Sequence, residues 1–442
     1  MVFKKAPCLF GSAIVVGILL AVAGILLLIG VPIDGIVNRQ VVAQDYLGFT
    51  RDSNGTEIPN QMTASWLKPP YSMKLNIWMF NVTNVDGILK RHEKPNLKEI
   101  GPFVFDEIQE KVYHRWAEND TRIFYKNKKL YFFNANLSCS ECHLSQKVTI
   151  PNIVFQKLVD AADVTIWGVR INFLCETNSL QRRIGFFYGQ NGTTDGTYEV
   201  DTGVPSPYKI GHLYTWNNMT VMPEGTWDTV YARMVNGTDG QLFSPMLKRE
   251  QRLTLFVPQI CRSVQMEYSR DVSVQGIPSW RYVPPKDLYD PKRPENQGFL
   301  WHAVSGLSVP SPTNDLTFVD LEPTAGVPTQ AKRIMQINVG MVKGDLSITE
   351  NTTNVIVPVL WMNETADFDD GTREQLSAIF NAKHYSFIAG VISSSLGLIC
   401  WLAVFVVIII FSRQADEEEY SRLVLDEDEI EPVEPQENVV LA

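Results

Sequence analysis

Two long uncharged apolar runs, one near each end of the chain, constrain this sequence more than any other feature. Residues 9–31 form the first run and residues 387–411 the second. A helix needs about 20 apolar residues to cross roughly 30 Å of hydrocarbon, so both runs are long enough. The first is too long for a signal-peptide core and no A-x-A-like cleavage site follows it. The sequence therefore predicts a protein anchored by two transmembrane helices.

Two spans would divide the chain into five parts. These are a short cytoplasmic tail (1–8), the first span (9–31), a large domain (32–386), the second span (387–411) and an acidic cytoplasmic tail (412–442). Lys4 and Lys5 precede the first span and Arg413 follows the second, which favours cytoplasmic tails under the positive-inside rule. The large domain would then lie outside the cell or in the lumen of an organelle.

Glycosylation signals support the same orientation. The pattern N-x-S/T occurs only between the two runs, at Asn54, Asn81, Asn119, Asn136, Asn191, Asn218, Asn236, Asn351 and Asn363. One such match is often chance, but a set confined to one side of both spans indicates a domain exposed to glycosylation.

The net charge of −10 belongs mostly to one tail. Residues 412–442 carry −9, Lys4 and Lys5 add +2, and the remainder is close to neutral at −3. A nucleic-acid-binding protein needs a basic face, so we do not expect a nucleic-acid partner.

The large domain has the patterning of a β protein. Period-two alternation or short apolar runs predict strands at residues 73–83, 252–257, 316–322, 333–342 and 354–362. In residues 333–342, Met335 and Ile337 alternate with Gln336, which predicts one inward and one outward face. Helical patterning is limited to residues 82–93 and 152–163. The prediction is one mainly β domain with a few helices.

The cysteines allow two interpretations. Residues 139–143, "CSECH", match the C-x-x-C-H attachment motif of c-type haem, with His143 as axial ligand. The match fixes only three positions, and no second motif or sixth ligand accompanies it. Disulfide chemistry is therefore the favoured interpretation in an oxidising compartment, and no cofactor is expected. The candidates are Cys139, Cys142, Cys175 and Cys261, whose three pairings the sequence leaves open.

Catalytic motifs are absent from the sequence. There is no G-x-S-x-G elbow, no H-E-x-x-H zinc motif, no Walker loop and no EF-hand loop. The six histidines are scattered rather than spaced as metal ligands. We therefore predict no catalytic or metal-binding residue and interpret the protein as a non-enzyme.

Two features of the tails point to membrane traffic. Tyr420 and Leu423 form a Y-x-x-apolar pattern, which as an extended peptide fills two pockets of a clathrin adaptor. The alternative is a chance match in a disordered acidic tail. Cys8 lies at the inner edge of the first span, where palmitoylation is common, although it is equally interpreted as a buried thiol.

Many separate motifs resemble class B scavenger receptors, the family of the fatty-acid translocase and lysosomal integral membrane protein type 2. They recur in the family's order along nearly the whole chain, both spans included. The motifs include "FNVTN" (80–84), "KPNLKEIGPFVF" (94–105), "FFYGQNGTTDGTYEVDTG" (186–203), "VNGTDGQLFSP" (235–245), "ICRSV" (260–264) and "FVDLEPTAG" (318–326).

The resemblance implies an antiparallel β-barrel capped by helices, with a tunnel that carries lipid toward the membrane. It implies lipids, lipoproteins, apoptotic cells or microbes as ligands, at the plasma membrane or in lysosomes. Two segments, residues 153–167 and 296–318, are shorter than in the family, so the helical cap is expected to be shortened. The usual partner of Cys261 falls in the second, which leaves this residue free or paired with another candidate.

The leading interpretation is a two-span receptor, with both tails cytoplasmic, that binds lipids or particles bearing anionic phospholipids. It would mediate their uptake or transfer lipid to the membrane. The alternative is a lysosomal or endosomal glycoprotein that carries a cargo protein, and a two-span ion-channel subunit is a remote third. Each allows a homo-oligomer. The sequence identifies no ligand-binding residue.

Overall fold

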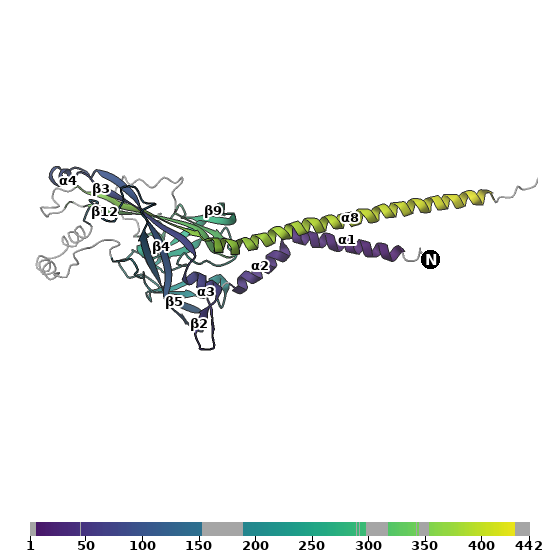
Figure 1. Cartoon of the computed structure of the whole chain (residues 1–442), viewed down its shortest axis with the longest axis horizontal. Coiled ribbons are helices and arrows are strands. Elements are labelled where there is room, and N and C mark those ends of the chain that lie inside the picture. The colour runs from purple at the N-terminus through teal and green to yellow at the C-terminus, as the bar shows by residue number, and fades with distance from the viewer. Residues whose placement is uncertain are drawn as a thin grey trace, which may run out of the picture. The chain divides into compact units, whose positions relative to one another are not determined.

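The computed structural model describes residues 6–44, 46–152, 189–288, 290, 292–297, 317–341, 343 and 353–428. Figure 1 shows its helices and strands. The chain divides into two compact units, one made of both ends of the chain, up to Val37 and from Ala378, and one spanning Asn38–Ser377. The predicted helix at 152–163 and the shortened segment at 153–167 fall almost entirely outside the described residues, as does most of the segment at 296–318.

The Asn38–Ser377 unit is built on one antiparallel sheet of eleven strands. The strands are β3 (Tyr71–Val82), β4 (Leu97–Ala117), β5 (Arg122–Phe133), β6 (Tyr198–Asp201), β7 (Leu213–Trp216), β8 (Leu253–Val257), β9 (Arg262–Val274), β10 (Ile277–Val283), β11 (Phe318–Glu322), β12 (Val327–Met341) and β13 (Val355–Phe368). Their order in the sheet is β7-β6-β5-β4-β3-β13-β12-β11-β10-β9-β8. Strands that are adjacent in the sheet are also consecutive in the numbering of the described strands, with one exception. The exception is the pairing of β3 with β13.

The segment Gly237–Thr238 links the two edges of this sheet. From β7, the Leu213 amide donates to the Gly237 carbonyl (2.7 Å). Thr238 pairs in parallel with Leu255 of β8, and its amide donates to the Thr254 carbonyl (3.0 Å). Gly237 has a φ of 86°, and a Cβ there would lie 2.0 Å from the Thr254 carbonyl oxygen. Only glycine fits at this position. Because the segment bonds to both edge strands, the sheet is a nearly closed barrel.

The predicted strands are confirmed. Residues 73–83 form β3, 252–257 form β8, and 316–322 form β11, each within about two residues. The two remaining predictions correspond to β12 and β13, both longer than expected. On β12, Gln336 is exposed while Met335 and Ile337 pack inside the barrel, as the alternation predicts.

Short helices and turns connect the strands. The described ones in this unit are α3 (Gln61–Leu67), α4 (Val85–Arg91), α7 (Val230–Arg233), and the 3₁₀ turns η1 (Pro207–Lys209), η2 (Pro258–Ile260) and η3 (Pro294–Asn296). The Asn60 side chain caps α3 by accepting from the Thr63 amide (2.7 Å). The helical prediction at 82–93 is confirmed by α4, which lies at the end of β3 (Figure 1). A separate two-stranded ribbon pairs β1 (Phe49–Arg51) with β2 (Glu57–Pro59).

The unit formed by the chain ends contains α1 (Ala6–Leu28), the start of α2 (Val31–Gln44) and most of α8 (Asp370–Asp428). Small residues let α1 and α8 approach closely. A Cβ on Gly24 would lie 2.3 Å from the Ser394 hydroxyl, and one on Gly397 would lie 2.9 Å from the Ala21 amide nitrogen. The Ser393 hydroxyl also donates to the Leu20 carbonyl (2.9 Å). This is the small-residue packing by which helices associate in membranes.

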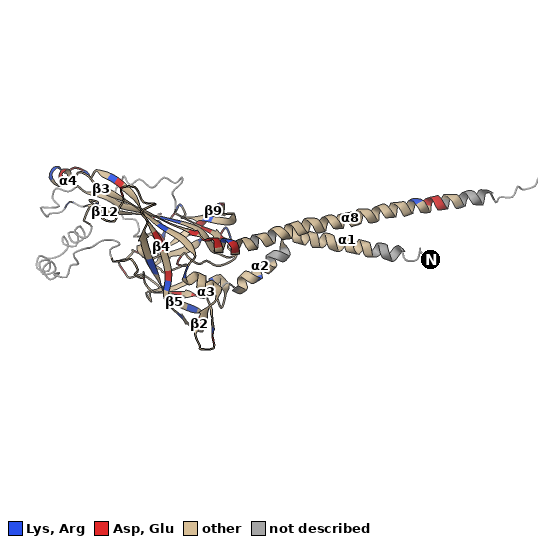
Figure 2. Cartoon of the chain, viewed as in Figure 1, with Lys and Arg blue, Asp and Glu red and all other residues tan. Residues whose placement is uncertain are grey.

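One helix among the described residues, His384–Glu418, is long and apolar enough to cross a membrane. The apolar segment Ser12–Leu28 of α1 is shorter, so the second span is not established by length. Gly30 has a φ of 73° between α1 and α2, which places a break inside the predicted span of residues 9–31. In Figure 2 the middle of α8 carries no charged residue. Along the sequence, the first charged residue after this stretch is Arg413.

Candidate functional site

The concave face of the sheet is identified by contacts between strands that are not neighbours. Lys129 on β5 donates to Glu364 on β13 (Nζ to Oε1, 2.9 Å). Two strands separate them, or about 14 Å along a flat sheet at about 4.8 Å per strand spacing. The sheet must therefore curve toward these two side chains. Every second residue along a strand lies on the same face of the sheet. The residues on the face of Lys129 and Glu364 therefore point into the barrel.

One part of this interior face is apolar. Leu75, Ile77, Leu360 and Met362 are buried there and pack together. Around them lie further apolar side chains that are only half-buried although they point inward: Met79, Phe103, Phe105, Tyr131, Met335 and Ile337. We call these ten residues the apolar layer. Inward-facing apolar surface that water still reaches is what a barrel offers an apolar ligand.

Four charged side chains follow the apolar layer on the same strands. Lys129 contacts Glu107 of β4 (Nζ to Oε1, 2.9 Å) as well as Glu364, and Arg333 of β12 donates to the other oxygen of Glu364. We call Glu107, Lys129, Arg333 and Glu364 the charged layer. The carboxylates are more deeply buried, with side-chain exposures of 0% for Glu107 and 11% for Glu364, against 18% and 31% for Lys129 and Arg333. The cations are thus the accessible part of this layer.

Burial and neighbouring charges shift the pKa values of the Glu107 and Glu364 carboxyls in opposite directions. Burial raises the pKa of Glu107 above its ordinary value, and Lys129 only partly opposes this. Burial also disfavours a charged Glu364, but Arg333 and Lys129 together outweigh it and lower the pKa of that carboxyl. Burial disfavours the charge of Lys129, yet its two carboxylate partners raise the pKa of its ammonium. Glu107 is therefore the member of the layer closest to being neutralised by acid.

Amides extend the charged layer toward the opposite wall of the barrel. The Gln109 amide donates to Glu107 (Nε2 to Oε1, 2.7 Å), and Gln241 in turn donates to Gln109 (2.7 Å). Gln241 lies just after the segment that joins the sheet edges. At the other end of the layer, Arg333 donates to Gln259 of η2 (3.3 Å). The polar side chains thus run across the interior, from η2 beside β8 and β9 to the loop after the edge junction.

A buried lysine lies next to this network. Lys111 donates to Gln241 and lies 3.9 Å from the Asp239 carboxylate. Its ammonium also lies over the ring of Trp66, 4.8 Å from the centroid. Burial lowers the pKa of Lys111 to about 8, with Asp239 partly opposing the shift. Lys111 is thus fully enclosed rather than exposed to a ligand.

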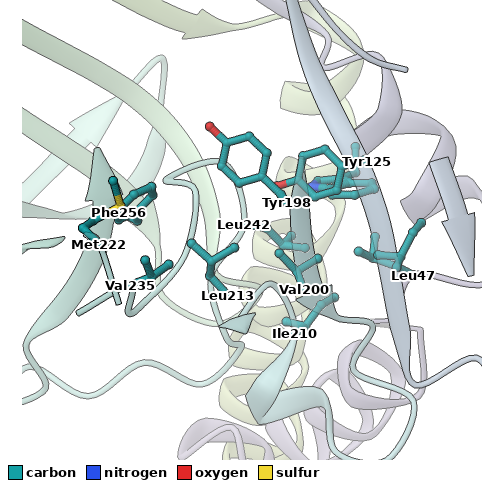
Figure 3. Close-up of a cluster of buried hydrophobic side chains, with 12 residues drawn as sticks. Leu47, Tyr125, Tyr198, Val200, Ile210, Leu213, Met222, Val235, Leu242 and Phe256 are labelled. Atoms are coloured by element: carbon teal, nitrogen blue, oxygen red, sulfur yellow. The ribbon is translucent and has the colours of Figure 1, made fainter. Parts of the chain in front are cut away.

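A second apolar cluster lies beyond the polar network. We call it the closed core; its members come from several strands and loops (Figure 3). Its buried side chains are Leu47, Trp66, Ile123, Tyr125, Tyr198, Val200, Ile210, Leu213, Met222, Val235, Leu242 and Phe256. Each is at most 5% exposed, so this cluster is packed shut. The polar network links to it through Tyr125, whose hydroxyl donates to Asp239 (2.7 Å).

The predicted glycosylation sites have different surroundings. Exposed asparagines are Asn54, Asn119, Asn136, Asn191 and Asn218, whereas Asn81, Asn236 and Asn363 are half-buried. The Asn81 side chain accepts from the Thr149 amide (2.8 Å), and Asn363 has an amide oxygen that is shielded from solvent without a partner. Asn191 is exposed, but its side-chain oxygen accepts from the Tyr131 amide and its side-chain nitrogen donates to the Tyr131 carbonyl. Asn351 lies outside the described residues.

The cysteines of "CSECH" form a disulfide with each other. Cys139 and Cys142 are joined with Cα atoms 5.0 Å apart, which leaves no thiol for haem attachment. His143 places its Nδ1 3.0 Å from the Glu141 carbonyl oxygen. Cys261 carries a free thiol whose pKa is raised by burial. Cys175 lies outside the described residues.

The tail motif lies in a helix rather than in an extended peptide. Tyr420 and Leu423 both fall within α8, and Tyr420 is 71% exposed. Acidic residues 416–419 crowd the C-terminal part of this helix, where the macrodipole disfavours negative charge. These turns are consequently easy to unwind into the extended form that an adaptor would bind. Cys8 lies in the first turn of α1.

The sequence did not point to the charged layer. Its four residues come from four strands, and none belongs to a catalytic or metal-binding motif. The one available signal was the string "DEIQEKV" at residues 106–112, directly after an apolar strand start. A run of charged and amide side chains at alternate positions there is compatible with a polar interior, but equally with a solvent-exposed edge.

Comparison with known proteins agrees with this architecture. A sequence model of the CD36 family matches residues 15–178, 164–301 and 299–408. The chain is 27% identical to lysosome membrane protein 2 of mouse and of human, over 85% of this chain and 89% of each relative. It is 25% identical to mouse scavenger receptor class B member 1, over 79% of both chains. The resemblance to class B scavenger receptors is thereby confirmed: the chain belongs to the CD36 family.

Proposed function

We propose that this protein is a membrane-anchored receptor that binds lipids or lipid-bearing particles and holds acyl chains inside its barrel. The observation that carries the proposal is the apolar layer, whose rim of six half-buried side chains faces the interior of a nearly closed sheet. Each buried methylene of a ligand gains about 0.8 kcal/mol, so such a surface retains acyl chains without covalent chemistry. The relatives named scavenger receptors support a receptor role.

The anchoring that we propose uses both apolar helices, with the Asn38–Ser377 unit on the glycosylated side of the membrane and both tails in the cytoplasm. The close packing of α1 and α8 through Gly24 and Gly397 supports a paired anchor. Charged residues are absent from the middle of α8, which fits helix packing in lipid better than an ion pathway.

Lipid binding is tested on the secreted fragment comprising residues 32–383, purified without added lipid. We expect lipid to co-purify in stoichiometric amount by mass spectrometry. The variant Met335→Arg places a charge in the apolar layer and is expected to lose that lipid. Gln336→Arg adds the same charge one position along β12, on the exposed face, and is the matched control. A folded, lipid-free wild-type fragment would contradict the proposal.

A second candidate function, a lysosomal or endosomal receptor for a cargo protein, is favoured by the exposed Tyr420 and by the lysosomal relatives. It predicts that clathrin adaptors set the location of the protein. Tyr420→Ala is expected to move the protein toward the cell surface, measured by surface labelling. Ser421→Ala alters a neighbouring side chain without removing the Y-x-x-apolar pattern and is the control. An unchanged distribution of Tyr420→Ala would rule out sorting by this motif.

A further inference from the structure

We propose that the Cys139–Cys142 disulfide is a thiol–disulfide exchange site, which a dithiol reductant reduces reversibly while the protein stays folded. The inference goes beyond the proposed lipid binding and does not depend on it. Three observations carry it: the bond lies across a single turn, the turn is anchored to the barrel by other contacts, and the two cysteines differ in exposure.

The disulfide joins the first and fourth residues of one tight turn. The Cys142 amide donates to the Cys139 carbonyl (2.9 Å), and the two Cα atoms lie 5.0 Å apart. A turn of this kind holds its end Cα atoms less than about 7 Å apart whether or not they are bridged. Disulfides form within that range. The two thiols should therefore stay adjacent after reduction, which lets the bond form again.

The turn is held on the barrel by contacts that do not involve sulfur. Asn134, directly after β5, donates from its amide to the Val104 carbonyl (2.8 Å). The Ser138 hydroxyl accepts from the Val104 amide (2.9 Å), and the Cys139 amide donates to the Pro102 carbonyl (3.0 Å). A disulfide stabilises mainly by closing a loop of the unfolded chain, and this gain grows with loop length. A bond between residues three positions apart therefore adds little to a segment that β4 already holds.

The two cysteines differ in their access to solvent. Cys142 is 7% exposed, whereas Cys139 is half-buried and is followed in the turn by two exposed residues, Ser140 and Glu141. The rate of exchange depends on which sulfur a thiolate can reach. We therefore expect the reductant to attack the sulfur of Cys139, with Cys142 as the leaving group.

The exchange has two balanced steps. A thiolate of the reductant attacks the Cys139 sulfur and forms a mixed disulfide, while the electron pair of the broken bond goes to the Cys142 sulfur, which takes up a proton. The second thiolate of the reductant then attacks the reductant sulfur of the mixed disulfide. This closes the disulfide of the reductant and releases the Cys139 thiolate, which is protonated. The protein gains two electrons and two protons, and the dithiol loses the same.

The first test uses the full-length protein in membranes of cells that express it, with dithiothreitol as the dithiol probe. Free thiols are blocked with one maleimide, and the remaining cysteines are reduced in denaturant and labelled with a heavier one. Peptide mass spectrometry then measures the oxidised fraction of Cys139 and Cys142. We expect reduction while resistance to limited proteolysis is unchanged, and re-oxidation when oxidised glutathione replaces the dithiol. A bond that is reduced only after denaturation would overturn the proposal.

An equilibrium measurement separates an exchange site from a structural bond. Structural disulfides of secreted proteins resist reduction by the glutathione pool, whereas exposed exchange sites are more easily reduced. The same membranes are equilibrated in buffers with different ratios of reduced to oxidised glutathione, and the oxidised fraction is measured as before. We expect the bond to pass from oxidised to reduced within this series. A bond that stays oxidised throughout would be structural, contrary to the proposal.

Single substitutions test the roles of the two sulfurs. Cys142→Ser leaves the more exposed Cys139 as a free thiol, and Cys139→Ser leaves the buried Cys142. Each variant is treated with biotinylated oxidised glutathione, and we expect roughly tenfold faster formation of the mixed disulfide in Cys142→Ser, because thiol reactivity follows exposure. The free thiol of Cys261 is measured in the same samples and should react alike in both. Equal rates would overturn the assignment of Cys139 as the attacked sulfur, and the wild-type measurements decide alone if a variant fails to fold.

Discussion

The closed core and the apolar layer are two regions of the barrel with similar composition and different accessibility. The closed core contains side chains such as Ile123 and Leu213 that are at most 1% exposed, whereas six of the ten members of the apolar layer are only half-buried. Aliphatic and aromatic residues form both, so composition does not separate them. The difference lies in how completely they are covered: loops and short strands enclose the closed core, whereas the rim of the apolar layer stays half exposed. Complete burial makes the first region part of the core that stabilises the fold, and the second is the region to which we assign the proposed lipid binding.

Breaking the charged layer that separates the two regions should give the largest effect. Lys129→Met leaves Glu107 without its cation and removes one of two cations from Glu364. We expect a loss of about 3–5 kcal/mol in the free energy of unfolding, as for one partner removed from a buried ion pair. Chemical denaturation of the detergent-solubilised protein, followed by tryptophan fluorescence, measures it. Lys128→Met, on the opposite face of β5, is the control, and equal stabilities of the two variants would contradict the burial argument.

A truncation in the closed core should come next. Ile123 is fully buried, so Ile123→Ala loses its transfer free energy and leaves a cavity. The expected loss is about 2–5 kcal/mol of unfolding free energy. Lipid content of the folded fraction should not change, because this side chain lies away from the apolar layer. A loss of lipid at unchanged stability would reverse the roles that we assign to the two regions.

The matching truncation in the apolar layer should show the opposite profile. Met79 is half-buried, so Met79→Ala removes less buried surface and leaves a site already open to solvent. We expect a stability loss of only about 1 kcal/mol. Retained lipid, measured by mass spectrometry after purification, should fall. If Met79→Ala destabilises the protein as much as Ile123→Ala, the apolar layer is an ordinary core.

The contrast between β12 and β4 shows where strand prediction from hydrophobic alternation works and where it fails. On β12, the alternation of Met335 and Ile337 with Gln336 identifies strand and orientation together. The strand β4 inverts this rule beyond Phe105. Glu107 and Gln109 are buried, and Ile108 between them is 47% exposed. If the apolar residues of β4 were assumed to face the core, its exposed face would be assigned to the interior. Contacts across the barrel, not local polarity, determine which face of this strand is buried.

The candidate site was unpredictable for the same reason. Lys129 and Glu364 are 235 positions apart, and only the placement of β13 beside β3 brings them together. In the C-terminal tail, by contrast, the candidate site was predicted but its local structure was not. The motif at Tyr420 was recognisable from its spacing, but the continuation of α8 through it was not, because its acidic composition favours an unstructured peptide.

The smallest effect that we expect is a change in stability with pH, which tests whether the charged layer responds to acid. Burial raises the pKa of Glu107 above its ordinary value of 4.5, so the native state binds this proton more tightly than the unfolded chain. Its contribution to stability is fully present below pH 4.5 and is lost as the pH rises through its native pKa. Glu364 has a lowered pKa, so its contribution persists above pH 4.5 and is lost only at lower pH.

Between neutral pH and pH 4.5, the Glu107 contribution should therefore dominate the response of the layer. We expect the wild type to gain stability relative to Glu107→Gln as the pH falls through this range, measured as the difference in unfolding free energy at each pH. Glu110→Gln, on the opposite face of β4, removes one carboxyl without touching the layer and should give a difference that does not vary with pH in this way. A pH-independent difference for Glu107→Gln would mean that Glu107 stays ionised in the folded protein. The charged layer would then keep its charge balance at acidic as well as at neutral pH.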